Sequence, residues 1–394
     1  MKFILFYLPS VGSLAQIKKG FAGQNTQNYQ NMLWQLSEQV KAADQMGFWG
    51  AAFTEHHFHI EGFETSNNPN LLALYVGQQT QHLRVGQMAN VLPFQNPLRL
   101  AEDLAMLDQM LRGRTFIGIA RGYQRRWADT LGQIYGVGGT MSDQSETDQR
   151  NRQLFEDHFR IMKKAWTERT FTHKSDTWTI PPENLDFDHQ AIRDYGAGLS
   201  DDGKITEIGI APQCYQKPHP PIFQPFSFSP STFEFCGRED IVPFGITTDP
   251  DITDDLLRTY QETAAANGRD YAIGQNVGMF RDCLVCPDAN EAHGYAANAN
   301  GFVWKNWFAP IGFNEALRRK GETGEIESSY ERLYESGFEF VGTTDDVNRQ
   351  IEQMVERHNP EYFLMWQYTG MIPHHVQMRS LEMWANDILP NWTD

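Results

Sequence analysis

One carboxylate and three imidazoles are crowded into five consecutive positions of the chain, at Glu55, His56, His57 and His59. They follow an apolar run at about 49–55 that is typical of a buried strand. An imidazole changes its charge near neutral pH, so it can move a proton or stabilise an oxygen anion, and a neighbouring carboxylate can orient it or hold the edge of a cofactor. The cluster therefore predicts acid/base chemistry at the end of this strand.

Two other interpretations of this cluster stay open. Clustered His and Glu side chains also bind zinc, but neighbouring side chains on an extended segment point apart, so we expect no metal site here. The same residues could also be ordinary polar residues of a loop.

Two further segments have residues that suit an anionic group. Arg121 stands between the small residues Ala120 and Gly122, which allow a ligand to approach closely, and its guanidinium suits a phosphate. Ser229 and Thr232 precede or open a helical run near 231–238, where hydroxyl and backbone N–H groups can bind phosphate. The alternatives are an arginine paired with a nearby carboxylate and an ordinary helix cap.

Composition excludes several classes of function. The formal net charge of −17 argues against a nucleic-acid partner, because such binding depends on clustered Lys and Arg. No window of about 18 apolar residues is present, so we expect no membrane span. Four scattered cysteines are too few for a disulfide framework and fit a reduced cytoplasm. Aromatic residues make up 13% of the chain, enough to line a large apolar pocket.

Short apolar runs alternate with segments of helical period, which is the pattern of repeated βα units. We predict helices at about 28–46, 69–80, 97–111, 149–167, 231–238, 253–267, 345–357 and 374–388. We predict strands at about 2–8, 49–55, 83–92, 116–120, 221–226, 242–247, 276–286 and 361–368. Eight parallel strands are the number that a closed barrel needs, so we expect an α/β protein with a single (β/α)8 TIM-type barrel over residues 1–394.

Two irregular segments interrupt this pattern and are predicted to be insertions, at about 170–215 and 290–335. The first is rich in Pro, Gly and Asp. The second is rich in rings, and it could either fold over the barrel mouth as a lid or serve as plain hydrophobic core. Its aromatic residues include Trp304, Trp307, Phe308, Phe313, Tyr330 and Tyr334.

A series of short fragments extends over most of the chain outside the two insertions. The early fragments are Glu55-His56-His57-Phe58, Asn68-Pro69, the stretches 85–93, 97–103 and 107–110, Gly113-Arg114 and Gly118-Ile-Ala-Arg-Gly122. The later ones are 216–221, the segment that ends at Thr232, and Phe340-Val-Gly-Thr343. In their order and spacing these fragments resemble the luciferase-like monooxygenases.

The resemblance assigns residues around a flavin ring. It implies that His56 is the catalytic histidine, which assists the reaction of the reduced flavin with dioxygen, and that Glu55 lies near the ring. Met88 and Ala89 fall on a bulge after the third strand that supports the ring and often contains a non-prolyl cis peptide. Ala120 takes a position where some luciferases have a reactive cysteine, so thiol-linked effects are not expected.

The resemblance also implies a phosphate-binding set of Arg121, Arg152, Ser229 and Thr232. The chain departs from the family at Ser227-Phe228, where luciferase has a carboxylate, and in one extra residue after Thr232.

The function that the resemblance implies is a monooxygenase that takes reduced FMN as a cosubstrate from a separate flavin reductase. With dioxygen it would oxygenate a hydrophobic organic substrate such as an aldehyde, a ketone or a terpenoid-like compound. The family also implies a homodimer packed through the helices near 70–80 and 97–111. The alternatives are a deazaflavin-dependent dehydrogenase or reductase of the same fold, a metal-dependent barrel hydrolase and a flavin-binding protein without turnover.

Overall fold

The computed structural model describes residues 1–393, and they divide into two compact units. The larger unit consists of residues 1–90, 116–119 and those from 221 onward. The smaller unit consists of residues 91–115 and 120–220. Each unit is described by itself below.

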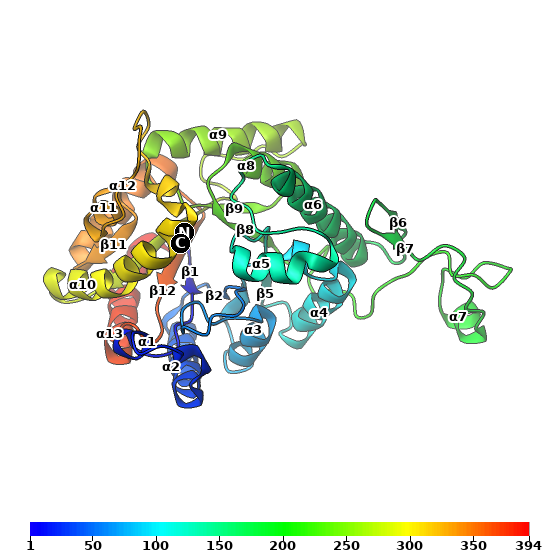
Figure 1. Ribbon diagram of the computed structural model, residues 1–394, viewed down its shortest axis with the longest axis horizontal. Helices are drawn as coiled ribbons and strands as arrows, with labels where there is room; N and C mark the ends of the chain where they lie inside the picture. Colours follow the sequence, from blue (N-terminus) through cyan, green and yellow to red (C-terminus); the bar gives the residue numbers. More distant parts are fainter. Residues whose placement is uncertain (394) are drawn as a thin grey trace. The chain divides into compact units, whose positions relative to one another are not determined.

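A closed barrel of eight parallel strands forms the centre of the larger unit (Figure 1). Around the barrel the strands follow the order β10, β12, β1, β2, β3, β5, β8 and β9, and β9 pairs with β10 to close the ring. Their bounds are β1 Lys2–Tyr7, β2 Gly50–Phe53, β3 Arg84–Gln87, β5 Thr115–Ala120, β8 Ile222–Ser227, β9 Val242–Gly245, β10 Gly278–Val285 and β12 Tyr362–Gln367. All eight predicted strands and the predicted barrel are therefore confirmed.

Burial on both faces explains why the strands could be found in the sequence. A parallel strand between the barrel interior and the outer helices has no face in water, so nearly every position is apolar. All eight residues of β10 are buried, and so are five of the six residues of β1. Where strands approach closely only glycine fits: a Cβ at Gly86 would lie 2.3 Å from the carbonyl oxygen of Phe116.

Helices of the larger unit surround the barrel (Figure 1). Those that the sequence predicted begin and end close to their predicted positions, except that α13 ends earlier, at Met383. The predicted ones are α2 Thr26–Met46, α3 Pro69–Gly77, α8 Pro230–Glu239, α9 Pro250–Ala266, α12 Thr344–His358 and α13 His374–Met383. Local signals set their ends, such as Gly47 in the left-handed conformation after α2 and the capping box of Thr343 and Asp346 before α12.

Several short elements of the larger unit were not predicted. The strand β11 Glu339–Gly342 pairs with β10 outside the ring of eight, and its four residues are too short for a clear pattern. The others are the helices α1 Leu14–Ile17, α10 Ala289–Ala296, α11 Tyr330–Glu335 and α14 Leu389–Trp392. The short strand β4 Asn90–Val91 lies within the strand predicted at 83–92, which the structure divides into β3 and β4.

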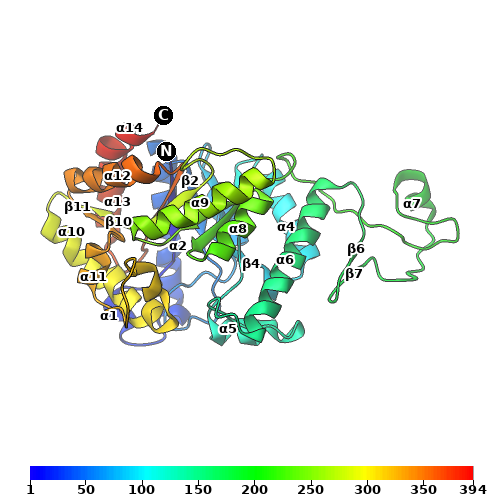
Figure 2. The same cartoon turned by 90° about the horizontal axis from the view of Figure 1, so that it is seen from above.

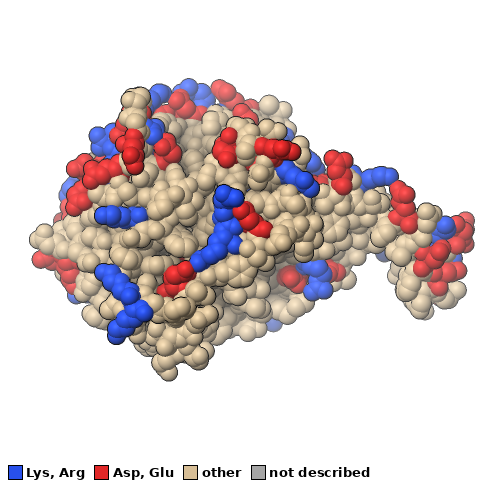
Figure 3. All heavy atoms as spheres, in the orientation of Figure 1, with Lys and Arg blue, Asp and Glu red and all other residues tan. Residues whose placement is uncertain are grey.

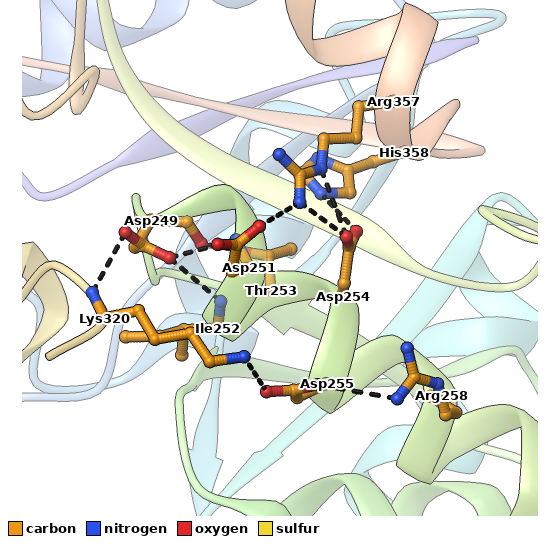
Figure 4. A network of polar contacts seen from close by, with 10 residues as sticks. All are labelled: Asp249, Asp251, Ile252, Thr253, Asp254, Asp255, Arg258, Lys320, Arg357 and His358. Atoms are coloured by element: carbon orange, nitrogen blue, oxygen red, sulfur yellow. Dashed lines mark hydrogen bonds and ion pairs between the residues drawn. The ribbon is translucent and has the colours of Figure 1, made fainter.

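The second predicted insertion is fastened to the larger unit by the acidic start of α9 (Figure 4). The Lys320 backbone N–H donates to Asp249 at 3.1 Å, and its ammonium group donates to Asp255 at 2.9 Å. From the other side Arg357, at the end of α12, pairs with Asp254 at 2.6 Å and with Asp251. The segment thus has a fixed anchor beside the barrel.

The smaller unit contains α4 Pro97–Met110, α5 Arg125–Leu131 and α6 Glu146–Thr167, of which α4 and α6 were predicted. The two long helices pack together, and the indole N–H of Trp166 donates to the backbone oxygen of Ala101 at 3.1 Å. After α6 the first predicted insertion forms the hairpin β6 His173–Lys174 and β7 Thr179–Ile180, followed by α7 Gln190–Tyr195. In Figures 1 and 2, α7 lies at the end of an arm that extends away from α6.

Charged side chains of both signs are interspersed on the face drawn in Figure 3, and the Lys and Arg side chains that adjoin one another at its centre have Asp or Glu side chains beside them. No helix within residues 1–393 is long and apolar enough to cross a membrane.

Candidate active site

The predicted histidine cluster lies at the carboxyl end of the barrel, directly after β2 ends at Phe53. His56 and His59 are buried, whereas His57 is partly exposed. The backbone N–H of His56 donates to the Ser66 oxygen at 2.7 Å, which holds the segment against the returning loop. In α/β barrels this end carries the active site.

Glu64 is the carboxylate that faces His56. Its Oε2 lies 3.4 Å from His56 Nδ1 and 3.6 Å from His59 Nδ1. The same oxygen accepts a hydrogen bond of 2.6 Å from the indole Nε1 of Trp307. Glu55 instead faces His57, with 3.1 Å between Glu55 Oε1 and His57 Nε2. Neighbouring side chains point apart on extended backbone, which explains why Glu55 contacts His57 rather than His56.

This environment keeps His56 neutral. Burial lowers the pKa of His56 well below its ordinary value of 6.5, and the nearby His59 and His57 lower it further. A neutral imidazole has one N–H and one lone pair, and a facing carboxylate stabilises the form with the proton on the nitrogen next to it. With Nδ1 directed to Glu64, Nε2 is the atom of His56 that can accept a proton.

Aromatic side chains of the second insertion cover this end of the barrel. Phe308 packs on Trp366 near the end of β12, with 5.1 Å between ring centroids, and Phe313 packs on Phe226 near the end of β8, at 5.7 Å. Trp307 lies 4.9 Å from the His59 ring. The segment lies over the strand ends and also contributes to the hydrophobic core, because Phe308 and Phe313 are buried among the rings that they contact there.

Met88 and Ala89 follow β3, and both are buried. The peptide bond between them is cis, as the resemblance predicted. Ala120 ends β5, and its methyl group offers no thiol at this position.

Arg121 and Arg152 lie close together in the smaller unit, and the charge of Arg152 lowers the pKa of Arg121 after the larger effect of burial. Arg121 is also paired with a carboxylate, at 2.6 Å between Nη1 and Asp148 Oδ1, and its Nη2 donates to Ser142. Asp148 in turn accepts from Thr140 at 2.9 Å. Asp143 also acts on the charge of Arg121, so the two guanidinium groups lie among acidic side chains.

Ser229 and Thr232 belong to the larger unit, where Ser229 immediately precedes α8. The hydroxyl of Ser229 makes no capping hydrogen bond to the helix backbone, and instead it contacts the hydroxyl of Thr232 at 3.0 Å. Ser229 is therefore not an ordinary side-chain cap. The two halves of the predicted phosphate set thus belong to different units.

Two buried polar atoms at the strand ends suit a bound polar ligand. Thr54 Oγ1, just after β2, and Trp366 Nε1, in β12, have no hydrogen-bond partner in the described part of the chain. Leaving such atoms unpaired is costly, so a ligand with hydrogen-bonding groups fits here. A flavin ring has such groups along one edge, and the residues present are compatible with it.

Sequence reasoning missed Glu64 and Trp307. Glu64 lies in an irregular loop, and Trp307 contacts it across 243 positions of the chain. The only available signal for Trp307 was its place among the rings of the insertion. Within residues 1–393 no group of three His, Cys, Asp or Glu side chains is arranged to hold a metal ion.

The family model for luciferase-like monooxygenases matches residues 10–358. This chain belongs to that family. It is 25% identical over 332 residues to 3,6-diketocamphane 1,6-monooxygenase of Pseudomonas putida, which covers 82% of each chain. It is 28% identical over 375 residues to the oxygenase component of the flavin-dependent trigonelline monooxygenase of Acinetobacter baylyi, which covers 91% of this chain and 90% of the other.

Solved structures agree on the fold. The oxygenating constituent of 3,6-diketocamphane monooxygenase from Pseudomonas putida, in complex with FMN, superposes with a TM-score of 0.70 at 20% identity and covers 92% of this chain and 93% of its own. An F420-dependent secondary alcohol dehydrogenase superposes with a TM-score of 0.63 at 13% identity over the whole of both chains. Membership of the family makes this luciferase-like monooxygenase a flavin-dependent oxidoreductase.

Proposed function

We propose that this luciferase-like monooxygenase uses reduced FMN and dioxygen to oxygenate a hydrophobic organic substrate, with a separate flavin reductase supplying the electrons. The observation that carries the proposal is the neutral, buried His56 facing Glu64 beneath an aromatic cover. The description of one relative as an oxygenase component supports a reductase partner.

When bound, reduced FMN supplies the electrons and activates dioxygen. Thr54, Glu55, the cis peptide of Met88 and Ala89, and the methyl group of Ala120 are the groups that would surround its ring. Arg121 and Arg152 would hold the phosphate, and the closeness of the two guanidinium groups supports this. Phosphate binding by Ser229 and Thr232 stays a prediction.

His56 would manage the proton at the reacting centre. Its Nε2 accepts or holds a proton, while Glu64 fixes the orientation of the ring through the Nδ1 side. Trp307 and Phe308 exclude water from this end of the barrel, which favours transfer of oxygen to substrate over loss of hydrogen peroxide. The surrounding rings suit an apolar substrate such as an aldehyde, a ketone or a terpenoid-like compound.

Isotope transfer tests this proposal. The purified chain would be supplied with FMN, NADH, an unrelated flavin reductase and ¹⁸O₂, together with a panel of aldehydes, cyclic ketones and terpenoids. We expect one ¹⁸O atom in an organic product, measured by mass spectrometry, and no product when the reductase is left out. Failure of the whole panel with reduced FMN, together with alcohol oxidation without oxygen when an oxidised deazaflavin is supplied to accept the hydride, would establish the deazaflavin-dependent alternative.

A homodimer is part of the same proposal. In the larger unit α3 exposes Leu71 and Tyr75, and in the smaller unit α4 exposes Met106 and Met110. Large apolar side chains exposed on a helix often form a subunit interface. Light scattering at micromolar concentration is expected to give twice the chain mass of 45.2 kDa, and a mass equal to one chain would refute the dimer.

A further inference from the structure

Two carboxyl groups are buried together on neighbouring strands, outside the histidine cluster. Asp282 of β10 and Glu339 of β11 are register partners, and both side chains are buried. Asp282 Oδ2 and Glu339 Oε2 have no other hydrogen-bond partner in the described part of the chain, and each carboxyl group affects the pKa of the other. Two ionised carboxylates have no hydrogen to donate to each other, so one proton must lie between them.

The pair continues into a chain of hydrogen bonds that crosses to β12. Asn300, in the π-helical turn Ala297–Gly301 of the second insertion, donates through Nδ2 to Glu339 Oε1. Its Oδ1 accepts a hydrogen bond of 2.6 Å from the hydroxyl of Tyr368, the residue that follows β12. Tyr368 is buried and stacks on Trp366, with 5.4 Å between ring centroids.

Each link fixes the direction of the next. The hydrogen bond between the carboxyl groups raises the pKa of Glu339 and lowers that of Asp282, so Glu339 donates the shared proton and Asp282 accepts it. The other oxygen of Glu339 can then only accept an N–H from Asn300, which turns the amide oxygen of Asn300 toward Tyr368. The Tyr368 hydroxyl must then donate to Asn300, and its own oxygen remains available as an acceptor. Tyr368 is close enough to Glu64 for the charge of Glu64 to raise its pKa, after the effects of burial, Asp282 and Glu339.

We infer that Asp282 and Glu339 share one proton and, through Asn300, act as positioning residues that hold Tyr368 as a hydrogen-bond acceptor at the active-site end of the barrel. The role in turnover rests on the proposed function, whereas the shared proton does not. Neither the histidine chemistry nor the phosphate site uses these four residues.

Burial and mutual repulsion raise the pKa of both carboxyl groups far above their ordinary range. The other groups that act on the pair are Cys283 of β10, Tyr330 of α11 and Tyr368, and none of these is a cation. The nearby Arg281 donates to the backbone oxygens of Phe280 and Thr247. The shared proton, rather than a neighbouring cation, therefore neutralises one of the two negative charges of Asp282 and Glu339.

The pH dependence of stability tests the shared proton without any assay of turnover. The folded protein holds a proton that the unfolded chain releases above about pH 4, so the pair's contribution to stability is present below that pH and is lost as pH rises toward the raised pKa. Glu339→Gln keeps both hydrogen bonds but does not titrate. We expect the stability of this variant relative to wild type to rise between pH 5 and 8.

The control for this experiment is Glu352→Gln on the exposed face of α12, which should show no such trend. The infrared band of a protonated carboxyl group should be present in wild type at pH 7 and absent from Glu339→Gln. If Glu339→Gln follows wild type at every pH and the band is unchanged, the shared proton is refuted.

Kinetic variants test the positioning. Asn300→Ala and Tyr368→Phe should each lower kcat about tenfold while KM and FMN affinity change little, and the double variant should lose no more than either single one. Glu339→Ala should lower kcat by the same factor, whereas Glu339→Gln, which keeps the hydrogen bonds, should retain most of the wild-type kcat. Additive losses, or no loss with Tyr368→Phe in a folded protein, would overturn the positioning. Absence of oxygenation by wild type would instead contradict the proposed function and leave the proton test standing.

Discussion

The two insertions have the same predicted length and both contain large aromatic residues, yet they fold in opposite ways. In the first, Phe187 and Tyr195 of the arm are 56% and 88% exposed. In the second, Trp304, Phe308 and Phe313 are buried. Aromatic content alone therefore does not decide burial. The second insertion meets a ring-rich surface at the strand ends, at Phe226 and Trp366, and it is also tied down by Asn300 and Trp307.

Removal of one aromatic ring from each insertion should give the largest difference between the two insertions, measured as the change in the free energy of unfolding. Phe308→Ala deletes a fully buried side chain that contacts Trp366, Phe313 and Phe226, and should lower the free energy of unfolding by about 3–5 kcal/mol. The matched variant Phe187→Ala in the arm should change it by less than about 0.5 kcal/mol. Denaturant unfolding measures both, and equal effects would contradict the distinction between core and arm.

The smaller unit should contribute to FMN binding through Arg121 and Arg152. Arg121→Glu should weaken FMN binding by more than about tenfold, or 1.4 kcal/mol, because it reverses one of the two charges assigned to the phosphate. Arg152→Glu should act similarly, and Arg126→Glu on the exposed face of α5 is the control. Equilibrium titration with FMN gives the three affinities. Unchanged affinity in both site variants would remove the phosphate assignment.

At the barrel end, the lowered pKa of His56 should displace the pH dependence of stability and of oxygenation toward acidic pH. Because burial holds the pKa of His56 well below 6.5, the folded protein binds fewer protons there than the unfolded chain does. Its contribution to stability is present above about pH 6.5 and is lost as pH falls below that value. Oxygenation should likewise stay constant down to about pH 6.5 and decline only in more acidic solution. A midpoint at or above pH 6.5, absent from His56→Gln, would contradict a neutral buried imidazole.

Truncation of the arm should have the smallest effect of these changes, measured as the rate of product formation. Asp186 and Lys204 form an antiparallel bridge, and the Phe187 N–H donates to the Gly203 oxygen at 3.1 Å, so residues 187–203 can be replaced by a two-glycine turn. We expect the rate of product formation to change by less than about twofold, a small effect on the free-energy scale. A large loss of rate would show that the arm takes part in turnover.

The barrel was predictable because its strands are buried on both faces and appear in the sequence as continuous apolar runs. The short strand β11 and the helices α5 and α10 lack a long pattern and were missed. The resemblance correctly predicted the cis peptide after Met88. Glu64, Trp307 and the pair of Asp282 and Glu339 depend on contacts between distant segments, and no local pattern of the sequence reports such contacts.

His56→Ala tests whether His56 directs the proton during oxygen transfer. The measurement is the ratio of ¹⁸O-labelled organic product to hydrogen peroxide at equal oxygen consumption, with His57→Ala as the control. We expect His56→Ala to bind FMN almost normally, to form product about a hundredfold more slowly and to release more hydrogen peroxide, and we expect a chelator to leave wild type unaffected. Full coupling of oxygen consumption to product in His56→Ala would contradict this role of His56.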